Sequence, residues 1–98
     1  MISIKMLNVL KKGVKIKIYK YWYMIEHIDG SFNPVYVVAT NYRESRTFVD
    51  RWNKEQNYPS PVYRSKYLER TDIRRKEKKV MYDIYLKELE RYGYYGKE

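Results

Sequence analysis

Residues 14–26 have the sequence VKIKIYKYWYMIE, and this stretch decides the fold. β-Branched and aromatic residues dominate it, and apolar and polar side chains alternate at its start, as expected of a strand with one buried face. We therefore predict a strand over residues 14–26. Val14, Ile16 and Ile18 would point to the buried face. The other face would carry Lys15, Lys17, Tyr19, Tyr21 and Tyr23.

Lys20 interrupts this alternation, because it falls on the same face as the isoleucines that precede it. Two arrangements explain the interruption. Either Lys20 lies beyond the edge of the sheet, or a β-bulge at Lys20 exchanges the two faces and turns Tyr21, Tyr23 and Ile25 inward. The sequence leaves both alternatives open.

Turn-forming residues separate this strand from its predicted partners. Residues 27–34 (HIDGSFNP) predict a hairpin connection, because Asp, Gly, Asn and Pro adopt turn geometry readily. Residues 35–40 (VYVVAT) would return as the second strand. Farther along, Pro59 and Pro61 exclude helix, and residues 62–68 are the candidate for a third strand at the sheet edge.

Asn41 and Glu44 predict the start of a helix. They have the spacing of a capping box, in which two side chains satisfy backbone amides that the helix N-terminus leaves without partners. We expect this helix to cover residues 42–56. Its apolar stripe would consist of Phe48, Val49 and Trp52.

A long second helix is predicted from residue 71 or 72 to residue 92, with Gly93 as its C-cap. Its first two turns, residues 72–79, are almost purely charged, so we expect them to project from the core. Its apolar stripe would consist of Val80, Met81, Ile84, Leu89 and Tyr92, with Tyr85 on the margin. If this stripe does not dock on the sheet, its alternative use is self-association into a homodimer.

These elements predict an α+β fold: a small single domain with a two- or three-stranded antiparallel sheet, packed by two helices of which the C-terminal one is long. A chain of 98 residues provides one compact core, which we assign to residues 1–93. Residues 94–98 would form a flexible tail. Residues 1–12 fit either a strand or a short helix, and we favour the helix.

The net charge of +9 is concentrated in two blocks. Residues 5–20 contain six lysines and no acid, and residues 64–79 contain eight bases against three acids. Such clustering is typical of a surface that meets a polyanion or an acidic protein. We therefore predict a binding function.

Our first hypothesis is a non-enzymatic nucleic-acid-binding or regulatory module. Lysines can neutralise phosphates and tyrosine rings can stack on unpaired bases, so RNA or single-stranded DNA is the favoured partner. The predicted binding residues are Lys15, Lys17, Tyr19, Tyr21, Arg70, Arg74, Arg75, Lys78 and Lys79.

Two other functions fit the same charges. The basic surface could dock on an acidic patch, or in the nucleic-acid channel, of a larger host enzyme or defence effector, as an inhibitor or adaptor. A metal-independent ribonuclease using Lys, Arg and Tyr is the second alternative. His27 is the single histidine and lies near Glu26 and Asp29, which is a weak indication of acid–base catalysis.

The amino-acid composition indicates the compartment and the kind of protein to expect. The chain has no cysteine, which fits a reducing cytoplasm, and its longest apolar run is far too short to span a membrane. We expect no metal and no cofactor, because no phosphate loop or metal motif is present. A single alanine beside abundant Lys, Ile, Tyr and Asn indicates an AT-rich genome, as in small viral or phage accessory proteins acting in the host cytoplasm.

Overall fold

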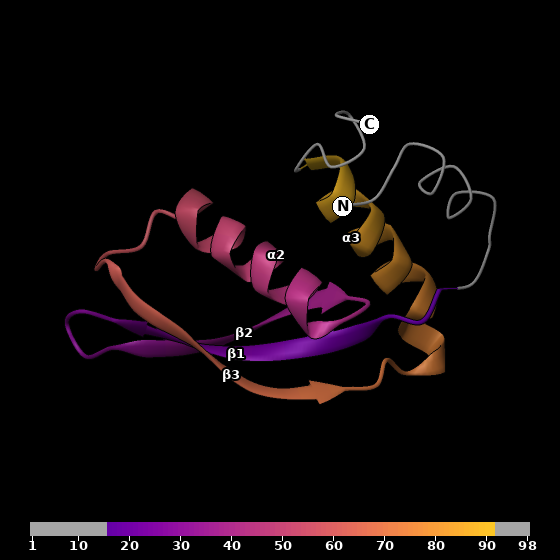
Figure 1. Cartoon of the computed structure of the whole chain (residues 1–98), viewed down its shortest axis with the longest axis horizontal. Helices are drawn as coiled ribbons and strands as arrows, with labels where there is room; N and C mark the ends of the chain where they lie inside the picture. Colours follow the sequence, from indigo (N-terminus) through magenta and orange to yellow (C-terminus); the bar gives the residue numbers. More distant parts are fainter. Residues whose placement is uncertain (1–15, 92–98) are drawn as a thin grey trace.

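The computed structural model describes residues 16–91, which form one antiparallel sheet and two α-helices (Figure 1). The predicted N-terminal helix, Lys15, Tyr92 and the C-terminal tail lie outside the described residues. The elements, in chain order, are β1 (Tyr19–His27), β2 (Phe32–Ala39), α2 (Tyr42–Glu55), β3 (Val62–Thr71), the 3-10 turn η1 (Arg75–Glu77) and α3 (Lys78–Arg91).

The sheet has the order β2-β1-β3, so β1 is the central strand and pairs antiparallel with both neighbours. Both described helices lie on one side of it (Figure 1). The predicted α+β class is therefore confirmed, with three strands in the described part of the chain. The predicted edge strand is also confirmed, although it continues three residues farther, to Thr71.

β1 turns Tyr21, Tyr23 and Ile25 toward the helices, which is one of the two arrangements left open by the sequence. The bulge that this alternative placed at Lys20 is absent, because β1 and β2 pair without a register shift from Tyr19 to Glu26. The other alternative is also wrong, because Lys20 lies inside the sheet and pairs with Val38. The faces change because β1 begins only at Tyr19. The preceding isoleucines therefore lie before the strand, and their alternation does not continue into it. The register shifts fall instead on the pairing with β3.

α2 begins as the capping signal predicts. Asn41 Oδ1 accepts a hydrogen bond from the Glu44 amide at 2.8 Å, and the helix ends one residue before the predicted position. Glu44 Oε1 reaches the amide and the hydroxyl of Thr40, at 2.8 and 2.9 Å, instead of the Asn41 amide. Phe48 and Val49 are buried as predicted, whereas Trp52 is only half-buried.

The prediction for the last helix was wrong in two respects: the helix begins later than predicted, and different residues form its buried stripe. β3 runs to Thr71, so the helical turns begin only at η1. Met81, Tyr85 and Leu89, four residues apart, form the buried stripe. Val80 and Ile84 are 57% and 36% exposed. Tyr85 takes the central place because Glu44 Oε2 accepts a hydrogen bond from its hydroxyl at 2.9 Å, so burial leaves no polar atom without a partner.

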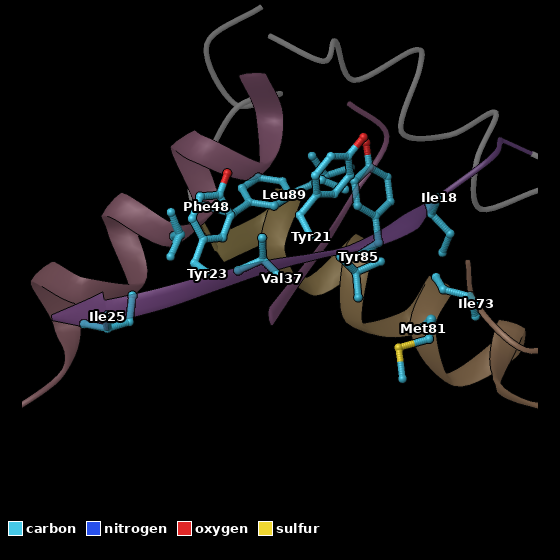
Figure 2. Close-up of a cluster of buried hydrophobic side chains, with 13 residues drawn as sticks. Ile18, Tyr21, Tyr23, Ile25, Val37, Phe48, Ile73, Met81, Tyr85 and Leu89 are labelled. Atoms are coloured by element: carbon cyan, nitrogen blue, oxygen red, sulfur yellow. The ribbon is translucent and has the colours of Figure 1, made fainter. Parts of the chain in front are cut away.

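The core lies between the sheet and the two helices (Figure 2). Near its centre the rings of Phe48 on α2 and Tyr85 on α3 lie 6.1 Å apart. At one end, Ile18, Ile73 and Met81 pack together, where the residues before β1 meet those after β3 (Figure 2). These apolar contacts therefore hold the segment before β1 against the segment after β3.

The corrected stripe of α3 predicts opposite results for two of its residues. Leu89→Ala should lower the free energy of unfolding by about 2–5 kcal/mol, because the side chain is fully buried. Ile84→Ala, on the same helix, should cost less than about 1 kcal/mol because Ile84 is partly exposed. Urea denaturation measures both values. Equal losses would contradict the placement of α3.

Tyr23 predicts a loss of stability at alkaline pH. Burial raises the pKa of Tyr23 above its ordinary value of 10.0, against the opposing effects of Ser45 and Arg46. Above pH 10 the unfolded chain therefore holds fewer protons than the folded one, and the free energy of unfolding falls as pH rises.

Urea denaturation from about pH 8 to about pH 11 tests this effect around the ordinary tyrosine pKa. Tyr23→Phe should make the decline shallower, because the buried group no longer titrates. Tyr63→Phe is the control, since that ring is 70% exposed. A Tyr23→Phe profile parallel to that of the unmodified chain would refute the assignment.

Candidate functional site

The two basic blocks of the sequence meet at Tyr19, the first residue of β1. The Arg70 guanidinium lies 4.2 Å from the centroid of the Tyr19 ring, and Lys17 Nζ lies 5.6 Å from it. Arg70 reaches this position because β3 pairs with β1 and sets Arg70 opposite Tyr21. A cation over a tyrosine face contributes about 0.5–1 kcal/mol at an exposed site. Three predicted binding residues from distant parts of the sequence are thus brought together.

Two tyrosines that the sequence did not single out extend this cluster. Tyr67 on β3 and Tyr42 in the first turn of α2 have rings in T-shaped contact, with centroids 5.2 Å apart. They are 38% and 49% exposed. The position of Tyr67 among the bases of the second block was the available signal, whereas nothing in the sequence pointed to Tyr42. We define the basic–aromatic surface as Lys17, Tyr19, Tyr42, Tyr67 and Arg70.

Tyr21 belongs to the core, and its predicted role in stacking on bases is corrected. Its side chain is only 3% exposed, so the ring cannot face a ligand. Burial raises the pKa of Tyr21, while a hydrogen bond and the charge of Arg70 act in the opposite direction. Tyr21 also lies beside Tyr19 and Tyr67, at ring separations of 6.3 and 6.4 Å. It forms the floor of the basic–aromatic surface and helps to position Arg70.

The predicted bases of the described chain are exposed and make no ion pair with a carboxylate in residues 16–91. Other bases differ: Lys20 is 3.6 Å from Glu77, and Arg64 is 2.5 Å from Glu26. A base without a carboxylate partner in the described chain keeps its charge for an external anion. Among the predicted binding residues, the six described bases have this property: Lys17, Arg70, Arg74, Arg75, Lys78 and Lys79.

The second block continues from β3 around the turn into α3. Arg74 and Arg75 lie at the start of η1, and Lys78 and Lys79 begin α3. We call these four residues the basic turn. Lys78 lines the same surface hollow as Lys17, together with Ile16, Ile18 and Tyr82. The basic turn therefore adjoins the basic–aromatic surface, and the two blocks are neighbours in space.

His27 is held in place by both ring nitrogens. Nδ1 donates to the Ser60 carbonyl oxygen at 3.0 Å, and Nε2 lies 2.9 Å from Asn33 Oδ1. The ring is 7% exposed and packs edge-on against Tyr58, with centroids 4.7 Å apart. These contacts connect the β1–β2 hairpin to the segment before β3. The geometry therefore gives His27 a structural role.

Within residues 16–91, no cluster of three or more His, Asp or Glu side chains is arranged to hold a metal ion. None of the described helices combines the length and apolar character needed to cross a bilayer.

Comparisons with protein-family models, with curated proteins and with solved structures found no match to this chain.

Proposed function

We propose that this chain is a non-enzymatic protein that binds single-stranded nucleic acid, RNA or DNA. One observation carries the proposal: Arg70 and Lys17 lie on the ring of Tyr19 and have no carboxylate partner in the described chain. Phosphates would bind the guanidinium and ammonium groups. The basic turn would extend these contacts along the strand.

The exposed tyrosines favour a single strand over a duplex. Unpaired bases can stack on Tyr42 and Tyr67, which are 49% and 38% exposed. In a duplex the base faces are already stacked on one another and are unavailable to a protein ring. The bases of the chain would supply most of the affinity, and the rings would supply the preference for unpaired nucleotides.

An acidic protein surface is the competing partner, because the same unpaired charges would steer it. We place nucleic acid first because exposed tyrosine rings beside cations provide both the stacking faces and the charges that a nucleotide requires. Docking on a host enzyme becomes the leading hypothesis if the chain binds no nucleic acid at low salt. RNA that shortens during incubation would instead support the ribonuclease alternative.

Fluorescence anisotropy with labelled single-stranded RNA, single-stranded DNA and duplex DNA tests the proposal across a salt series. We expect dissociation constants of about micromolar or below at low salt. If all six bases neutralise phosphates, the logarithm of the affinity should fall with the logarithm of salt at a slope of about −4. The absence of binding at low salt would refute the proposal.

A charge-matched pair of variants tests the location. Arg74→Glu with Arg75→Glu changes the net charge by −4 within the basic turn, and Lys54→Glu with Lys87→Glu makes the same change elsewhere on α2 and α3. The first variant should weaken binding at least about tenfold and flatten the salt slope by about 1–2. Equal losses in both variants would show that only the net charge matters and would contradict this surface.

A further inference from the structure

The side of the sheet opposite the helices carries its own aromatic residues. Residues that pair directly across strands point to the same side, and Tyr23 points to α2 through its hydrogen bond with Ser45. Neighbouring positions of β1 therefore point away from the helices, which lie on one side (Figure 1). We define the open face by its apolar members: Trp22, Met24, Phe32, Pro34 and Tyr36.

The open face does not include the last residues of β2, because these residues are buried in the core. Val38 has the parity of the open face, yet it is only 1% exposed. Beyond it, Tyr36 is 37% exposed and Phe32 is 66% exposed. A contiguous exposed patch of this kind, on the surface of a small domain, is typical of a binding site.

Its two central rings are held in place. The Trp22 and Tyr36 centroids lie 5.0 Å apart at an interplanar angle of 50°. Trp22 Nε1 donates a hydrogen bond to Thr71 Oγ1 at 2.9 Å, which ties the indole to β3. Lys20 Nζ lies 4.9 Å from the Tyr36 ring. Rings fixed on strands present their faces to a ligand without losing further side-chain freedom on binding.

We infer that the open face binds unpaired bases of the strand whose phosphates bind the basic turn, an inference that rests on the proposed function. A hollow lined by both Trp22 and Arg74 connects these two surfaces. Stacking on tryptophan and tyrosine suits any base, because every base has an aromatic face.

The carboxylates of the hollow favour binding of a base there and disfavour binding of a phosphate. Glu69, Asp72 and Glu77 line it together with Trp22 and Arg74. Glu77 is paired with Lys20, but the charges of Glu69 and Asp72 repel a phosphate from the ring positions, whereas carboxylate oxygens accept hydrogen bonds from the amino groups of bases. The strand therefore runs with its phosphates toward the basic turn and with its bases over the open face.

Two substitutions at one position test the ring itself. Tyr36→Leu keeps an apolar side chain but removes the aromatic face, and Tyr36→Phe retains that face. We expect Tyr36→Leu to weaken single-strand binding by about 5- to 150-fold and Tyr36→Phe to stay within about twofold of the unmodified chain. Duplex affinity should be the same in all three proteins.

Tryptophan fluorescence gives an independent measurement. Trp52→Phe leaves Trp22 as the single tryptophan of the chain. Single-stranded oligonucleotide should then quench its emission in parallel with the anisotropy change, while duplex should not.

The outcomes distinguish this inference from the proposed function. If the unmodified chain binds neither single strand nor duplex, the proposed function fails and the inference fails with it. If the chain binds and Arg74→Glu with Arg75→Glu weakens binding, but Tyr36→Leu and the Trp22 emission show no effect, the open face is excluded and the proposed function stands. A protein bound at the open face would give this second result.

Discussion

The structure depends on finding partners for the hydroxyl groups of buried tyrosines. This small core contains tyrosine rings that are fully or almost fully buried, and a buried hydroxyl without a hydrogen bond is costly. Tyr23 contacts Ser45 Oγ at 2.7 Å, and Tyr85 donates to Glu44 at 2.9 Å. Both partners lie in the first turn of α2, so β1 and α3 are fixed relative to the start of one helix.

The same requirement shapes the surface that we propose as the binding site. Tyr21 is buried, and a hydrogen bond and the charge of Arg70 act on its pKa against the effect of burial; Arg70 also lies over the Tyr19 ring. Arg70 thus serves the core with one contact and presents charge at the surface. Because β1 and β3 must pair for this contact to form, folding itself joins two basic blocks that are about fifty residues apart in sequence.

The sequence predicted the elements that neighbouring residues determine. It did not predict the features that depend on contacts between distant parts of the chain. The cap at Asn41 set the start of α2. The alternation and turn residues predicted the three strands in the right order, but β1 begins only at Tyr19 and β2 begins at Phe32, inside the predicted hairpin connection. The facing of Tyr21 was open because a tyrosine suits either side of a sheet, and it follows from where β1 begins and from the helices that cover this side. The charged residues before Lys78 were predicted as α-helix, but residues 72–74 follow β3 without helical structure and only Arg75–Glu77 form a 3-10 turn. Tyr42 and Tyr36 carried no sequence signal, since their exposure follows from the packing of the helices.

Charge pairing divides the surface into regions with different chemistry. On the side of the open face, Lys20 pairs with Glu77 and Arg64 pairs with Glu26, so much of the charge there is internally compensated. The basic turn and the basic–aromatic surface lack such pairs among the described residues. A compensated aromatic face beside an uncompensated basic one matches the two halves of a nucleotide, a base with an aromatic face and an anionic phosphate. An acidic protein would need the second region alone, whereas an unpaired strand would engage both regions, which is the physical basis for preferring it.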